Sequence, residues 1–192
     1  MIIRIAILSA LLLFPVSAHS QNMVSINVGG GLGLPMGDGL DNAKIGPAIV
    51  AGVSLDISES AAIVLEGQYS QYKPDDDVGI PSGVDATVKL TGVNVGARLQ
   101  TPRENPARAY LHLGLGLTRG TGQTSRSFGG INVNASDSEN SFSFLVGIGM
   151  KYAVTETVSL IVDTRYNHAL DHFGSSTQWI PITAGLSFTF PG

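Results

Sequence analysis

The chain has 192 residues, of which 14 % are charged and 43 % hydrophobic, and its formal net charge is −4. An average soluble domain has about 25 % charged residues, so this chain lacks much of the Lys and Glu that normally coats a water-facing surface. The absence of cysteine excludes disulfides and thiolate metal sites, and the mildly acidic charge does not indicate nucleic acid as a partner.

The first 18 residues have the pattern of a secretory signal peptide. Arg4 provides the positive charge, residues 5–16 form an apolar run, and small residues precede the expected cleavage after Ala18. This run is too short to cross a bilayer of ~30 Å as a helix. We therefore expect residues 1–18 to direct export through the Sec pathway and to be removed, which leaves residues 19–192 as a single domain.

Beyond this segment, apolar residues alternate with small or polar residues, which predicts β-strands with one apolar face. Leu111, Leu113 and Leu115, for example, alternate with His112 and Gly114. No later segment is long and apolar enough for a transmembrane helix, so any membrane span must consist of strands. In chain order, the predicted strands span residues 24–34, 46–57, 61–72, 87–100, 108–120, 141–154, 158–168 and 178–190.

The composition of the second strand face decides where the apolar face points. A secreted soluble barrel or sandwich would carry Lys, Glu, Gln and Arg on that face, because it would meet water. Here the face is mostly Gly, Ser, Thr and Asn, which fit the crowded interior of a narrow barrel. The fold class we predict is therefore all-β, an eight-stranded antiparallel up-and-down transmembrane β-barrel in the outer membrane.

Short and long connections alternate along the chain, as in outer-membrane barrels with short periplasmic turns and long external loops. The short connections are residues 58–60, 101–107 and 155–157, and the long ones are 35–45, 73–86, 121–140 and 169–177. Aromatic residues are expected at both rims of the membrane. We assign Tyr110, Tyr152, Phe188 and Phe190 to the inner rim, and Tyr69, Tyr72, Phe142, Phe144, Tyr166 and Trp179 to the outer rim.

Six ionisable residues fall on inward positions, and they comprise three acids and three bases: Asp56, Glu66, Arg98, Lys151, Asp163 and Arg165. Charges inside a membrane barrel are costly unless paired, so we expect a plug of paired charges. The alternative is a polar lumen that conducts ions. Centring each hairpin on its turn places Glu66 opposite Gly52, Asp163 opposite Gly149, Arg165 opposite Gly147 and His112 opposite Gly96, with Lys151 diagonal to Asp163.

Catalytic, metal and cofactor sites are not predicted. The local candidate for a lipid A-modifying enzyme is His172 with Ser175 or Ser176 and Asp171, in an external loop and without the expected spacing. The acidic segment at residues 75–77 lacks the alternating spacing of a calcium loop and is expected to be solvated.

Two segments carry a family resemblance. Residues 147–167 read as a Gly-x-Gly-x-x-Tyr strand, a tight polar turn and an acidic-x-Arg-Tyr strand, and residues 182–190 alternate apolar residues up to a final aromatic. This pattern resembles the OmpA/OmpX/opacity-type outer membrane protein β-barrel domain family. The resemblance implies recognition of the C-terminal strand by the barrel-assembly machinery, although here Pro191 and Gly192 follow the aromatic. It also implies a role as a structural anchor, an adhesin or a host-factor-binding protein.

The function we expect is therefore structural or surface interaction through the external loops, in a membrane of outer-membrane lipid and lipopolysaccharide. The longest loop, residues 121–140, contains the candidate contacts Phe128, Ile131 and Val133 for host or extracellular proteins. The strand-like segment 131–134 suggests hairpins that extend above the membrane and offer edges for β-augmentation. Because the loops have no basic cluster, heparin-type adhesion is disfavoured. The alternatives are a small pore or transporter and a lipid A-modifying enzyme.

Overall fold

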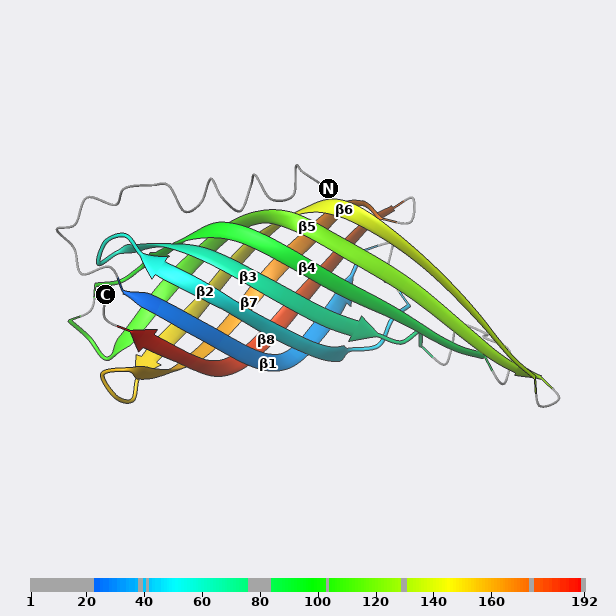
Figure 1. Ribbon diagram of the computed structural model, residues 1–192, viewed down its shortest axis with the longest axis horizontal. Coiled ribbons are helices and arrows are strands. Elements are labelled where there is room, and N and C mark those ends of the chain that lie inside the picture. The colour runs from blue at the N-terminus through cyan, green and yellow to red at the C-terminus, as the bar shows by residue number, and fades with distance from the viewer. Residues whose placement is uncertain are drawn as a thin grey trace.

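In the computed structural model, eight antiparallel strands close into one barrel, in which each strand pairs with its neighbours in sequence and β1 pairs with β8 (Figure 1). The structure describes residues 23–37, 40, 42–75, 84–102, 104–128, 131–172 and 175–190. Within these ranges no helix is long and apolar enough to cross a membrane. The strands are β1 (Val24–Met36), β2 (Gly46–Asp56), β3 (Ala61–Tyr72), β4 (Val84–Gln100), β5 (Ala107–Phe128), β6 (Ile131–Ala153), β7 (Val158–His172) and β8 (Ser175–Phe190). The predicted fold class is confirmed.

The apolar face of the strands points outward and the polar face lines the lumen. On β5, Leu115 is 54 % exposed and pairs with Val95 of β4 and Phe144 of β6, which also face outward. The lumen-facing Thr118 and Asn94 are buried. This inverted arrangement suits a lipid environment, because exposing such a large apolar belt to water would be unfavourable.

Short connections at residues 57–60, 101–106 and 154–157 lie at one end of the barrel, where β1 begins and β8 ends (Figure 1). The opposite end carries the longer connections at residues 37–45 and 73–83 and the ends of the β5–β6 and β7–β8 hairpins. The prediction of a long connection at residues 169–177 is wrong, because β7 continues to His172 and β8 begins at Ser175. In outer-membrane barrels the short turns face the periplasm, so we call the opposite end external.

The prediction of a loop at residues 121–140 is wrong, because β5 and β6 stay paired as far as Phe128 and Ile131 and are joined by two residues. The strand-like segment 131–134 is part of β6, so the hairpin extends beyond the other strands as this segment suggested. β4 accompanies them up to the pair between Val84 and Arg126. In Figure 1 these three strands extend to the right beyond the other five. Outside the membrane neither face of a strand needs to be apolar, so the alternation that marks the membrane-spanning part is lost although the backbone pairing continues.

The predicted aromatic girdles are correct in part. Tyr152, Phe142, Phe188 and Phe190 face outward, as do the half-buried Tyr69, Phe144 and Tyr166. The assignment is wrong for Tyr72, Tyr110 and Trp179, which are buried inside the barrel. Depth along a strand sets how near a side chain lies to the rim of the membrane, but the alternation of the strand decides whether it faces lipid or the lumen.

Candidate functional site

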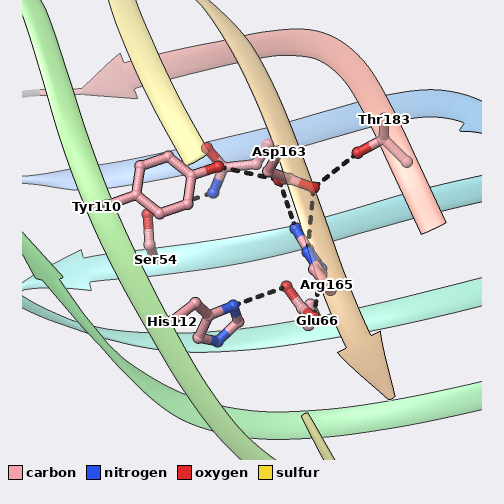
Figure 2. Close-up of polar contacts among 8 residues, drawn as sticks. Ser54, Glu66, Tyr110, His112, Asp163, Arg165 and Thr183 are labelled. Carbon is pink, nitrogen blue, oxygen red and sulfur yellow. Dashed lines mark hydrogen bonds and ion pairs between the residues drawn. The ribbon is translucent and has the colours of Figure 1, made fainter. Parts of the chain in front are cut away.

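The centre of the lumen is an ion-paired cluster formed by β3 and β7, which lie across the barrel from each other. Arg165 on β7 donates from Nε to Oδ1 of Asp163 at 3.2 Å and from Nη2 to Oδ2 at 2.8 Å. Its Nη1 donates to Oε1 of Glu66 on β3. All three side chains are at most 7 % exposed. Figure 2 shows the guanidinium between the two carboxylates, so one cation bridges opposite walls of the barrel.

Strands β4, β5 and β8 supply the remaining partners of this cluster. Tyr110 on β5 donates to Oδ2 of Asp163 at 2.9 Å, and Thr183 on β8 donates to Oδ1 at 2.8 Å. Nδ1 of His112 lies 3.8 Å from Oε2 of Glu66 (Figure 2). The guanidinium carbon of Arg98 lies 4.5 Å from the centre of the Tyr110 ring. The carboxylate of Asp163 therefore accepts four hydrogen bonds in a water-poor interior, where each unmade bond would be costly.

Glycines opposite the charged side chains make the space for them. Glu66 pairs with Gly52, Arg165 with Gly147 and Asp163 with Gly149, as the hairpin geometry predicted. A Cβ atom at Gly52 would lie 2.7 Å from Cβ of Glu66, and one at Gly149 would lie 2.7 Å from Cβ of Asp163. The lumen is therefore packed with one large side chain against each glycine.

One predicted cross-strand pair differs in the structure. His112 pairs with Arg98 rather than with Gly96, because the connection at residues 101–106 pairs Gln100 with Tyr110 and so moves the centre of the hairpin by one residue. The His112 ring still covers Gly96, since Nε2 lies 2.8 Å from where a Cβ at Gly96 would be.

Lys151 and Asp56, which were expected in the same network, lie nearer to the periplasmic end. Lys151 is diagonal to Asp163 as predicted, but it does not contact that carboxylate; it donates instead to Oγ1 of Thr189 at 3.1 Å. Asp56 accepts a hydrogen bond from Gln100 at 3.3 Å. The Asp163 carboxylate pairs with Arg165 because a guanidinium two residues away on the same strand can donate two hydrogen bonds, one to each carboxylate oxygen.

A hydrophobic cluster closes the external end of the lumen, and sequence reasoning missed it. It comprises Leu40, Tyr72, Leu90, Ala169 and Trp179, each at most 4 % exposed. Leu40 comes from the connection between β1 and β2, in a turn that follows Gly37 with φ +75°. A positive φ suits glycine. The sequence signal for this cluster is Leu40 itself, an isolated apolar residue in a polar connection.

The external sheet, which we define as residues 84–90 of β4, 119–128 of β5 and 131–142 of β6, has two edges. β3 pairs with β4 only as far as Tyr72 and Val88, and β7 pairs with β6 only as far as Ala169 and Ser143. Beyond these pairs the described strands leave the edge of β6 open. The backbones of Phe128, Ile131 and Val133 form the tip of this sheet, while their side chains lie outside the described part.

The residues considered for catalysis or metal binding are only partly described. The side chains of residues 171–175 and the whole of Asp76 and Asp77 lie outside the description. Asp75 forms an exposed ion pair with Lys44 at 3.7 Å, and the ring of His168 stacks on Phe144 with 4.9 Å between centroids. Among the described residues no three His, Asp or Glu side chains are grouped to hold a metal ion.

Residues 6–190 match the sequence profile of the outer membrane protein beta-barrel domain. The chain belongs to this family. Membership, together with the closed barrel, places it in the outer membrane of the cell. A search of curated protein sequences found no match.

Several solved outer-membrane barrels have the fold of this family member. The attachment invasion locus protein Ail of Yersinia pestis, solved with the heparin analogue sucrose octasulfate, is 19 % identical, with a TM-score of 0.58 over 88 % of this chain and 100 % of that chain. Neisserial surface protein A is 22 % identical, with a TM-score of 0.55 over 89 % and 98 % of the two chains. A major outer membrane protein of Thermus thermophilus is 12 % identical, with a TM-score of 0.61 over 87 % and 99 %. At these identities the likeness is one of fold.

Proposed function

We propose that this family member is a non-enzymatic surface-interaction protein, in which a plugged barrel anchors the external sheet and presents it to extracellular or host proteins. The observation that carries this proposal is the continuous pairing of β4, β5 and β6 beyond the ends of the other strands. A paired sheet holds its shape outside the membrane, whereas an irregular loop of the same length would have to be ordered on binding.

The open edge of β6 is the favoured contact surface. An unpaired strand edge presents a row of N–H and C=O groups that can pair with an extended segment of another protein. Residues 135–138 on this edge are exposed. Phe128, Ile131 and Val133 at the tip are the candidate apolar contacts that would add specificity.

A small pore or transporter is the second candidate, and the packing of the lumen argues against it. The bridge from Glu66 through Arg165 to Asp163 crosses the lumen, and the cluster around Tyr72 and Trp179 lies above it. We expect no steady conductance from the refolded barrel in planar bilayers. A stable, ion-selective current that is abolished by Arg165→Glu would favour the pore instead.

The route to the membrane is also proposed. Residues 1–18 would direct export through the Sec pathway and be removed, and residues 19–192 would form the barrel domain. The C-terminal strand ending at Phe190 would be the segment that the barrel-assembly machinery recognises. A truncation after Phe190 tests whether Pro191 and Gly192 affect assembly.

The surface-interaction proposal is tested with a shortened hairpin. Deleting residues 122–127 and 132–137 together removes six pairs between β5 and β6 and five between β4 and β5, and it keeps every remaining side chain of the hairpin on its original face. Cells that display this variant should lose binding to immobilised extracellular-matrix and serum proteins, while the barrel still folds.

Two further variants separate the edge from the tip. Ser136→Lys places a charge on the β6 edge, and Phe128→Ser with Ile131→Ser changes only the tip. Loss of binding in the edge variant alone indicates that the partner pairs with the β6 strand. Loss of binding in the tip variant alone indicates that the partner contacts the tip side chains. Unchanged binding by cells with the shortened hairpin would contradict the proposed function.

A further inference from the structure

Two basic residues face outward among the described side chains of the strands, and they are neighbours. Leu90 belongs to the hydrophobic cluster at the external end of the lumen, and Val88 packs against it. Because successive side chains of a strand point to opposite faces, Lys89 between them faces outward. Arg119 is exposed between the buried Thr118 and Gly120. Among the strand side chains that the structure describes, every other Lys or Arg belongs to the lumen side.

Strand register places these cations in two polar rows at the external end of the lipid-facing belt. One row is Tyr69, Thr91, Arg119 and Asn140, and the next row outward is Gln71, Lys89, Thr121 and Ser138. We call these eight residues the headgroup patch. The row immediately below contains Val93, Leu117 and Phe142, which are 59 %, 63 % and 50 % exposed.

The two cations keep donor capacity for a ligand. Nζ of Lys89 donates to Oε1 of Gln123 at 2.8 Å, and Nη2 of Arg119 donates to Oγ of Ser138 at 2.8 Å. Neither has a carboxylate partner among the described residues. An ammonium has three donors and a guanidinium five. Lys89 and Arg119 are diagonal neighbours on adjacent strands, a spacing of about 7–8 Å that one phosphate group can bridge.

We propose that the headgroup patch binds the phosphorylated headgroup of an anionic glycolipid in the outer leaflet of the membrane. The membrane's own lipid is favoured over a soluble anion because the patch continues directly from the apolar belt. An acyl chain lying against Val93 and Leu117 brings its headgroup to Arg119 and Lys89 within two to four residues of strand, about 7–14 Å. Neutral polar groups of Thr91, Asn140 and Thr121 surround the cations and suit the hydroxyl groups of a sugar. The hydroxyl of Tyr69 donates to Oε1 of Gln71 at 2.8 Å and is left to act as an acceptor.

The patch lies where β4 and β5 leave the membrane and enter the external sheet. A lipid bound there would fix the depth and orientation of this sheet relative to the membrane. The inference is independent of which protein the sheet binds, since lipid binding is measured on the isolated barrel.

Native mass spectrometry of the folded barrel in detergent micelles can count bound lipid directly. We compare diphosphorylated lipid A with the same lipid after removal of its phosphates, and inorganic phosphate is added as a competitor. Wild type should bind the phosphorylated lipid, bind the dephosphorylated lipid at least tenfold more weakly, and not release its lipid to millimolar phosphate.

Variants locate the site. Each basic residue contributes about fivefold to binding at an anionic membrane surface, so Lys89→Gln with Arg119→Gln should weaken the affinity about thirtyfold. The matched control, Lys44→Gln with Lys73→Gln, makes the same change in net charge elsewhere on the external side and should have little effect. The exchange Lys89→Arg with Arg119→Lys keeps both positive charges and should bind the lipid as the wild type does. Heat-dependent gel migration verifies that each variant is folded.

Three results would overturn the proposal. The first is equal affinity for the dephosphorylated lipid, which would assign the binding to acyl chains. The second is an equal loss in the control variant, which would assign it to overall charge. The third is displacement by inorganic phosphate, which would identify a site for the free anion.

Discussion

Arg165 and Asp163 lie two residues apart on β7 and meet through two hydrogen bonds, from Nε to Oδ1 and from Nη2 to Oδ2. Side chains two positions apart on a strand share a face, so this pair needs no other strand to form. Glu66 on the opposite wall then joins the pair through the remaining guanidinium nitrogen. One side chain therefore ties a local pair to a contact across the barrel.

Arg165→Met is expected to lower the free energy of unfolding by about 3–5 kcal/mol, because it leaves two buried carboxylates without their cation. Arg165→Lys should recover only part of the loss, since an ammonium cannot form the fork. Denaturant unfolding in lipid vesicles, followed by the fluorescence of the buried Trp179, measures both. Lys73→Met on the exposed surface is the control, expected to change the free energy by at most about 0.5 kcal/mol.

Double-mutant cycles should separate the two possible partners of Asp163. Arg165→Met combined with Asp163→Asn should show a coupling free energy above 1 kcal/mol, within the range of about 0.5–3 kcal/mol found for residues in one network. Lys151→Met combined with Asp163→Asn should be additive to within about 0.5 kcal/mol, because the Asp163 carboxylate does not contact Lys151. Strong coupling to Lys151 would instead support the diagonal pair expected from sequence.

Gly149→Ala is expected to destabilise the barrel by about 1–3 kcal/mol, the usual cost of overpacking. The added methyl would lie 2.7 Å from Cβ of Asp163 and would also overlap the Tyr110 ring. Gly122→Ala in the external sheet is the matched control, because no atom lies within 4 Å of its Cβ position. Equal unfolding free energies for the two variants would show that the lumen is less tightly packed than the structure indicates.

Leu115→Arg tests the direction of the strand faces. Leu115 is 54 % exposed in the middle of the apolar belt, and an arginine at the midplane costs about 2–4 kcal/mol. Ser125→Arg, on the same face of β5 but in the external sheet, should cost little. If both changes were harmless in vesicle unfolding experiments, the belt would not face lipid.

Cysteine labelling tests which end of the barrel is external. Cysteine at Ser125 or Ser138 should react with an impermeant thiol reagent on intact cells. Cysteine at Glu59 or Glu156, in the short turns, should react only after the outer membrane is permeabilised. The chain has no native cysteine, so no background labelling is expected, and reaction at both sets on intact cells would contradict the assigned topology.

Particular residues show how far the sequence predicts this protein. Alternation with a period of two predicted eight strands, their closure into a barrel and the outward direction of Leu113 and Leu115, because a strand in lipid must keep one face apolar along its whole membrane span. The tight turns at residues 58–60 and 155–157 also predicted the pairs of Glu66 with Gly52 and of Arg165 with Gly147. In both hairpins the centre of the turn determines the register.

Tertiary structure decided the features that depend on where separate strands meet. The length of the external sheet comes from backbone pairing, which leaves no hydrophobic pattern in a polar segment. The choice of Arg165 over Lys151 as the partner of Asp163 depends on how a guanidinium fork fits across the lumen. Lys89 and Arg119 are thirty residues apart in the sequence, so a search for basic loops does not find them. They become neighbours because the register of β4 and β5 places both on one face, where the lipid-facing belt ends.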